Sequence, residues 1–222
     1  MLPVAVSETS RLPLPQRLAL TYSPARARGA TLALLALDHR LGRAVAQASE
    51  PIMGQMRLAW WRDMLRQPVS ARPLSDGLIP LLSCWAGEED TLIALVDGWE
   101  EMLADPPLPA SAALSLIEAR AGAFAALARI VGAGGQATAA ANSARVWALG
   151  DLAAGLGNPE ERALALSQNN PAWAESARLP RLLRPLAILS ALGRRSLAKG
   201  GLPLLDGPGA SLLAMRIGMT GR

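Results

Sequence analysis

The chain has 222 residues, of which 51% are apolar and only 4% aromatic, a composition that favours helices over strands. Its net charge of +4 is too small and too dispersed for a nucleic-acid-binding surface, and the single cysteine, Cys84, excludes an intrachain disulfide and a cysteine metal site. There is no secretory signal pattern and no uncharged apolar run of about 18 residues. We therefore expect a cytoplasmic protein without a spanning helix, with peripheral contact with the inner membrane left open.

The N-terminal third of the chain predicts a loose start and two helices. Residues 1–12 are polar and irregular, which is typical of a loose terminus. The pair Ser23-Pro24 predicts a helix start, because Ser is a good N-cap and Pro fits the first helical position. That helix should run to about residue 48, and Pro51 begins a second one that runs to about residue 66.

The rest of the chain reads as further helices with short connections. They are expected at 76–86, 88–105, 110–131, 136–156, from Pro159 onwards, at 181–199 and after Gly209. No repeat and no inter-domain linker is present in the sequence. We predict one all-α domain over residues 13–222, a bundle of about eight helices.

The second predicted helix carries the most distinctive motif, Gln55-Met-Arg57-Leu-Ala-Trp60-Trp61-Arg62-Asp63-Met-Leu65. Arg57 and Trp61 are four residues apart and share a helical face, so the indole can stack on the guanidinium. The neighbouring stripe is Met53, Met56, Trp60 and Met64. Two interpretations stay open: either Trp60 packs in the core while the arginines pair with acids, or the helix forms the wall of a hydrocarbon pocket with Arg57 near a diphosphate.

This motif resembles the Arg-Leu-x-Trp-Trp-Arg-Asp-x-Leu helix of squalene/phytoene synthase-like proteins. Four weaker segments resemble the same family in the right order: Arg17–Pro24, Ala33–Leu37, Leu95–Leu103 and Leu179–Leu189. The resemblance implies the all-α isoprenoid-synthase fold. In active members it also implies Mg²⁺, held by Asp-x-x-x-Asp motifs on two facing helices, and head-to-head condensation of isoprenyl diphosphates.

The acidic motifs that such catalysis needs are missing. The resemblance puts the first set of acids near Gly42, Arg43 and Ala46, and Asp38 is the only acid of that helix. On the Ala-rich helix that should carry the second set, Asp151 is the only carboxylate. One acid per helix cannot make a multi-metal site, so we predict no catalytic residue and no metal ligand.

Other polar groups give weaker hypotheses. Asp97, Glu101 and Asp105 lie four apart with Glu100 beside them, which is typical of a solvated face or, less often, a cation site. His39 is the only histidine, so neither a zinc site nor a catalytic triad is expected. The late arginines Arg181, Arg184 and Arg195 can line one side of a helix and bind an anionic headgroup.

The leading hypothesis is a non-catalytic member of this family that binds an isoprenoid or other lipid, or a protein partner, without a cofactor. Some family members with a similar pattern are implicated in assembly of respiratory complex I. The alternative is an active Mg²⁺-dependent head-to-head prenyl transferase, and a third hypothesis is a helical adaptor with no ligand. The candidate ligand- or partner-binding residues are Arg57, Trp60, Trp61, Arg62, Glu101, Arg181 and Arg184.

Overall fold

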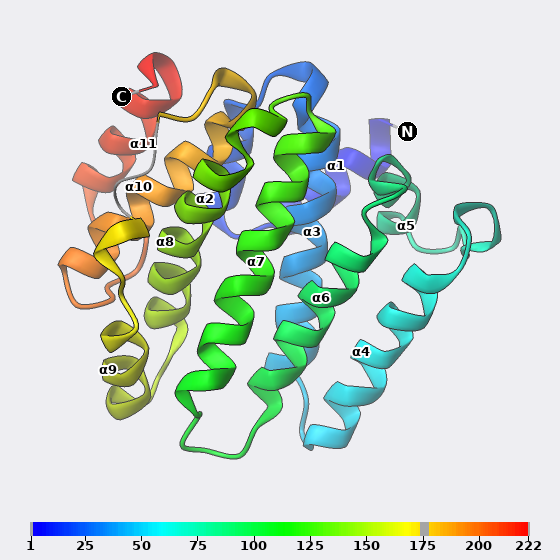
Figure 1. The fold of residues 1–222 in the computed structure, drawn as a ribbon, viewed down its shortest axis with the longest axis horizontal. Coiled ribbons are helices and arrows are strands. Elements are labelled where there is room, and N and C mark those ends of the chain that lie inside the picture. The colour runs from blue at the N-terminus through cyan, green and yellow to red at the C-terminus, as the bar shows by residue number, and fades with distance from the viewer. Residues whose placement is uncertain (1, 174–177, 222) are drawn as a thin grey trace.

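The computed structural model describes residues 2–173 and 178–221, and these ranges contain eleven α-helices and no strand. The all-α prediction is confirmed (Figure 1). The α-helices are α1 (Leu2–Arg11), α2 (Leu14–Thr21), α3 (Ala25–Ala46), α4 (Pro51–Arg66), α5 (Leu78–Leu81), α6 (Glu89–Glu100), α7 (Ala110–Ile130), α8 (Ala137–Gly155), α9 (Pro159–Ser167), α10 (Arg184–Ala198) and α11 (Pro208–Thr220). Short 3-10 turns are η1 (Val69–Ala71), η2 (Leu82–Trp85), η3 (Glu101–Leu103), η4 (Gly134–Gln136), η5 (Pro171–Trp173) and η6 (Arg181–Leu183).

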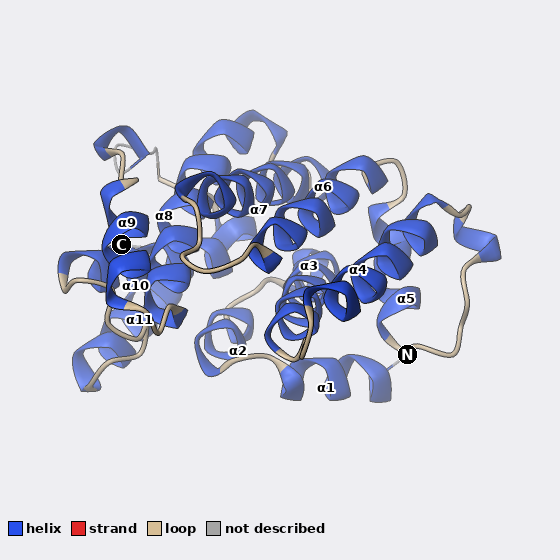
Figure 2. Cartoon of the chain, turned by 90° about the horizontal axis from the view of Figure 1, so that it is seen from below, coloured by secondary structure: helices blue, strands red, loops and turns tan. Residues whose placement is uncertain are grey.

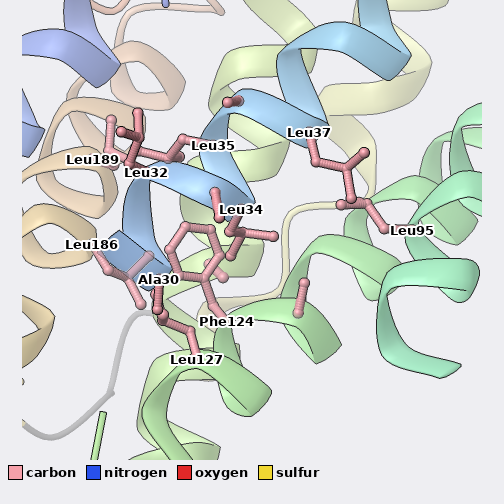
Figure 3. Close-up of a cluster of buried hydrophobic side chains, with 14 of the residues drawn as sticks. Ala30, Leu32, Leu34, Leu35, Leu37, Leu95, Phe124, Leu127, Leu186 and Leu189 are labelled. Carbon is pink, nitrogen blue, oxygen red and sulfur yellow. The ribbon is translucent and has the colours of Figure 1, made fainter. Parts of the chain in front are cut away.

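Helix α3 lies at the centre of the bundle. Its residues are apolar on every face between Leu32 and Leu37, and a helix that is apolar all round is stable only when it is buried. Figure 3 shows α10 supplying Leu186 and Leu189 to one side of α3, while Leu95 of α6 and Phe124 of α7 approach from another. This continuous core fixes α3 relative to the helices around it.

A row of helices covers one side of α3. Helix α7 lies between α6 and α8, α4 lies beside α6, and α10 lies beside α8 (Figure 1). Helices α1 and α2 contact α3 from the side away from α7 (Figure 2).

The prediction of irregular structure at residues 1–12 is wrong, because Leu2–Arg11 form α1, which is held by charge pairs. Glu8 is only 3% exposed and accepts hydrogen bonds from Arg11 at 2.7 Å and from Arg40 of α3 at 2.9 Å. Leu12 is also buried. The charged residues of this segment have a partner far along the chain, because Glu8 pairs with Arg40. The local sequence does not reveal that partner.

Helix boundaries differ modestly from those expected. Helix α3 begins at Ala25 with Pro24 as its N-cap residue, and the helix α2 before it was not among the helices predicted from the residue pattern. The helix expected to continue to Asp105 is regular only to Glu100 and then tightens into η3. The described residues therefore contain eleven α-helices where about eight were expected, and the predicted helices keep their order.

By length and composition, α7 is apolar enough to cross a membrane, which the sequence criterion did not anticipate. Of its apolar stretch, 56% is buried inside the fold. The helix also carries Arg120, whose guanidinium is buried. These features are those of a core helix, so they explain the apolar composition of α7 without a membrane.

Candidate functional site

Basic side chains from three helices surround a cavity of about 420 Å³ between α1, α3 and α4, here called the basic groove. Its charged and polar lining consists of Glu8, Arg11, His39, Arg40, Arg43, Gln47 and Arg57. Four arginines therefore face one carboxylate. The volume is within the range of about 300–1,000 Å³ that small-molecule sites have.

The arginines of the basic groove differ in how far their charge is neutralised. Arg40 pairs with Glu8 at 2.9 Å and also with Asp76, and Arg11 pairs with Glu8. Arg43 and Arg57 have no carboxylate partner among the described residues. Two exposed guanidiniums without a counter-ion make this groove a favourable place for an anion.

The positive charge of the basic groove affects the pKa of His39. Burial lowers the pKa of His39 below 6.5, and the charge of Arg43 lowers it further, against smaller opposing effects from Asp38 and Asp151. The imidazole is therefore neutral at pH 7. It can donate or accept one hydrogen bond without adding charge to the groove.

A second space of about 400 Å³, here called the apolar cavity, lies on an adjacent face of α3. Apolar atoms dominate its walls, which include Val45, Ala46, Trp99, Met102, Leu152 and Leu156. Gln16 also lines it, is 4% exposed, and has an Oε1 atom without a hydrogen-bond donor. A buried amide oxygen without a partner is costly, so a ligand hydroxyl or amine would be stabilised beside it.

The two spaces are adjacent, because His39 and Arg43 line both of them. These residues are one helical turn apart on α3, so they form a common wall. The combined site offers positive charge at one end and apolar surface at the other. This is the arrangement that suits an anionic amphiphile.

An ionic cluster lines the apolar cavity and is here called the Arg120 cluster: it consists of the buried Asp38 and Arg120 and the partly exposed Asp151. Arg120 donates from Nε and Nη2 to the two oxygens of Asp38, both at 2.9 Å. Its Nη1 donates to Asp151 Oδ2 at 3.1 Å. One guanidinium of α7 thus joins carboxylates of α3 and α8.

Two indole rings enclose this guanidinium. Its carbon lies 5.0 Å from the ring centre of Trp99 and 4.8 Å from that of Trp147, which are cation–π distances. The Trp99 Nε1 group also donates to Asp38 Oδ1 at 2.9 Å. The aromatic rings exclude water and so strengthen the ion pairs.

The electrostatics of the cluster follow from burial and proximity. Burial by itself lowers the pKa of Arg120, but Asp38 and Asp151 outweigh this effect and the pKa lies above its ordinary value. Burial raises the pKa of the half-buried Asp151, while Arg120 opposes the rise. The guanidinium of Arg120 is therefore charged at neutral pH.

The Mg²⁺ that the family resemblance implies does not fit this arrangement. Both oxygens of Asp38 and one oxygen of Asp151 are already bonded to Arg120. The positions at which the resemblance puts further acids, Gly42, Arg43 and Ala46, do line the apolar cavity, yet none is acidic. Among the described residues, no group of three His, Cys, Asp or Glu side chains is placed to hold a metal ion.

The predicted residues of α4 have different environments. Arg57 is exposed and lines the basic groove, whereas Trp61 is 6% exposed and faces the core. Trp60 is 46% exposed and meets Trp61 edge to face, so the interpretation that Trp60 packs in the core is wrong. Arg62 donates to Asp97 at 2.6 and 2.8 Å and also to Glu100, a pairing that fastens α4 to α6.

The other predicted residues lie outside both cavities. Glu101 is exposed in η3, beside the acids that pair with Arg62. Arg181 is exposed in η6, and Arg184 donates to the Ile217 carbonyl at 2.8 Å near the end of α11. The structure therefore brings Arg57 to the combined site and leaves Glu101, Arg181 and Arg184 elsewhere.

The sequence analysis did not identify Arg11, His39, Arg40 and Arg43 as groove residues, nor Arg120 as the partner of Asp38. One signal was present, because Asp38 follows a run of apolar residues in a helix that must be buried. A buried carboxylate requires a cation. Arg120 lies in a similarly apolar helix and was the available candidate.

No protein-family model, curated protein or solved structure matches this chain.

Proposed function

We propose that the chain is a non-catalytic squalene/phytoene synthase-like protein that binds one anionic amphiphile across its two adjoining cavities. The observation that carries the proposal is that His39 and Arg43 line both the basic groove and the apolar cavity. A ligand with a phosphate-bearing head and an apolar chain matches this division. Isoprenyl diphosphates and phospholipids share this chemistry.

The basic groove supplies the head-binding part. Arg43 and Arg57 present guanidiniums without carboxylate partners, and a guanidinium can donate two parallel hydrogen bonds to a phosphate. Arg40 is already paired with Glu8 and Asp76, so its charge is largely neutralised and it mainly forms part of the groove wall. Two unpaired arginines are suited to a phosphate or diphosphate group.

The apolar cavity supplies the chain-binding part. Removing apolar surface from water contributes about 25 cal/mol per Å², so each methylene that enters the cavity stabilises the complex by about 0.8 kcal/mol. Trp99 and Leu152 offer wide apolar contact, and Gln16 offers one buried acceptor for a polar group on the chain. The head alone or the chain alone would therefore bind more weakly than the joined molecule.

The Mg²⁺-dependent transferase alternative has less support. It needs several carboxylates free to coordinate metal ions, whereas the carboxylates nearest the cavity are Asp38 and Asp151 and both are bonded to Arg120. For this reason the proposal assigns the site to binding. A transferase would have to displace Arg120 before any metal could reach these oxygens.

The outer face of α4 supports the peripheral membrane contact that the sequence left open. Ile52, Met53, Met56 and Trp60 are each 43–63% exposed. Met53 and Trp60 lie four residues before and three after Arg57, so they border the basic groove. We propose that this face docks on an anionic bilayer, since apolar side chains beside free arginines match such a surface.

A vesicle assay tests the docking. M56E should reduce sedimentation with vesicles of phosphatidylglycerol and phosphatidylcholine, while M219E, on the exposed face of α11, should not. Native protein that sediments equally well with pure phosphatidylcholine, or not at all, would contradict an anionic bilayer as the partner.

Calorimetric titration in EDTA tests the ligand proposal. The probes are farnesyl diphosphate, farnesol and inorganic pyrophosphate, which carry both parts, the chain alone and the head alone. We expect farnesyl diphosphate to bind at least about tenfold more tightly than either fragment, because its binding uses both cavities. If farnesyl diphosphate bound no more tightly than farnesol or pyrophosphate, the joint site would be refuted. If no probe bound, a protein partner would be favoured and should be sought by pull-down.

A further inference from the structure

We propose that the guanidinium of Arg120 is a built-in substitute for a divalent cation, and that it holds the carboxylates of α3 and α8 together without metal. The inference goes beyond ligand binding, because it concerns a cation position that the protein fills from its own chain. It does not depend on which amphiphile binds. The disagreement between the Arg120 cluster and the expected Mg²⁺ site is the starting point.

The geometry is that of a shared cation. Asp38 and Asp151 come from different helices, and both line the apolar cavity. Arg120 binds both oxygens of the first carboxylate at 2.9 Å and one oxygen of the second at 3.1 Å. Without a cation between them the two carboxylates would repel each other at the cavity wall, and the cost would be high because Asp38 is buried.

The packing shows that the guanidinium is a permanent part of the fold. The Arg120 side chain is 4% exposed and lies against the rings of Trp99 and Trp147. Asp38 accepts a further hydrogen bond from Trp99. Both oxygens of Asp38 are therefore bonded without a metal ion.

The same oxygens are good ligands for a divalent ion when the guanidinium is absent. Carboxylate oxygens are the ligands that Mg²⁺ and Mn²⁺ prefer, and two carboxylates suffice for a site that keeps several waters. Truncation of Arg120 to alanine opens a space between Asp38 and Asp151. The proposal therefore predicts that R120A acquires a dependence on divalent ions that the native chain lacks.

The experiment measures the thermal unfolding midpoint with EDTA and with millimolar Mn²⁺ for four proteins: the native chain, R120A, R120A combined with D38N, and R72A. R72A is the matched control, because Arg72 is 5% exposed and pairs with a single carboxylate, Glu89, at 3.1 Å. Both arginines are thus buried and ion-paired. Of these two arginines, only Arg120 pairs with two carboxylates, so only its truncation leaves two neighbouring carboxylates without a cation.

We expect the native midpoint to be the same in EDTA and in Mn²⁺. R120A should unfold about 10 °C lower in EDTA and recover a large part of that loss in Mn²⁺. R72A should also be less stable but should not respond to Mn²⁺, and the D38N/R120A protein should not respond either. If R120A folds only when Mn²⁺ is present, the proposal is supported equally.

Three outcomes would overturn the proposal. The first is a native midpoint that rises with Mn²⁺ as much as that of R120A. The second is an R120A response no larger than that of D38N/R120A or R72A. The third is R120A that yields no folded protein even in Mn²⁺, because the two carboxylates would then require the guanidinium itself and not a cation in its position.

Discussion

His39 and Arg43 lie one helical turn apart on α3, and both line the basic groove and the apolar cavity. Residues four apart share a helical face, so this single turn forms the boundary between a charged and an apolar space. A phosphate held by Arg43 would therefore lie at the entrance to the cavity. The hydrocarbon chain attached to that phosphate would then enter the apolar cavity directly.

Replacement of Arg43 or Arg57 by alanine should weaken binding of farnesyl diphosphate by about 10- to 100-fold, because each change removes charge-assisted hydrogen bonds to phosphate. The affinity for farnesol should change little. R129A is the matched control, since Arg129 is exposed and paired with Glu88 away from both cavities. Calorimetry measures all three, and equal losses for R43A and R129A would show that only net charge matters.

Replacement of Ala46 by tryptophan should block the apolar cavity and leave the fold intact, because Ala46 lines the cavity but is exposed. We expect farnesyl diphosphate to bind no more tightly than pyrophosphate, a loss of about tenfold or more, while pyrophosphate binding is unchanged. Calorimetry with both probes measures the effect. Unchanged affinity for farnesyl diphosphate would mean that its chain lies elsewhere.

The stability of the protein should fall in mild acid because of His39. Burial first, and Arg43 second, lower the pKa of His39 below 6.5 in the folded state, against Asp38 and Asp151. The unfolded chain then binds the proton more readily, so the free energy of unfolding is highest above about pH 6.5 and decreases as the pH falls. Denaturant unfolding of native and H39Q protein between about pH 5 and 8 measures this, and H39Q should show a smaller decrease.

R43A provides an independent check on this pH effect. Without the Arg43 charge the pKa of His39 should rise toward its ordinary value, so the loss of stability in acid should become smaller. The same slope in native, H39Q and R43A proteins would assign the effect to other groups.

The contact between α8 and α10 should not tolerate a side chain at Gly193. A Cβ atom on Gly193 would lie 2.7 Å from the Trp147 Cα and from the Val146 carbonyl oxygen, which are backbone atoms of α8. G193A should therefore lower the free energy of unfolding by about 1–3 kcal/mol. The control is G122A in α7, where a Cβ meets no atom within 4 Å and where alanine should stabilise the helix by up to about 1 kcal/mol.

Denaturant unfolding compares the two glycine variants directly. A loss of stability in G193A together with a gain in G122A would confirm that close helix packing, and not helix propensity, sets the requirement at Gly193. A neutral G193A would mean that α8 and α10 can separate without cost.

The helical fold was predictable because its pattern is local. Leucine and alanine recur through the segments that form α3, α7 and α8, and Pro51 and Pro159 mark helix starts that the structure confirms. Helix α1 was missed because its order depends on the contact between Glu8 and Arg40, which are far apart in sequence. A local pattern contains no record of such a partner.

The site was predictable only in part, for the same reason. Arg57 was identified from its motif, and the structure places it in the basic groove. Asp38 was recognised as a lone acid, but its partner Arg120 lies 82 residues away. The exposure of Trp60 beside the buried Trp61 depends on how α4 is rotated against α6, and two adjacent indoles do not specify that rotation.

The most direct test of a non-catalytic binding site is titration with farnesyl diphosphate in EDTA and again in Mg²⁺, while release of pyrophosphate is followed in the same samples. We predict the same affinity under both conditions and no release, since Arg120 occupies the oxygens that a metal would need. Binding only in Mg²⁺, or release of pyrophosphate when Mg²⁺ is added, would contradict the account and favour the prenyl transferase alternative.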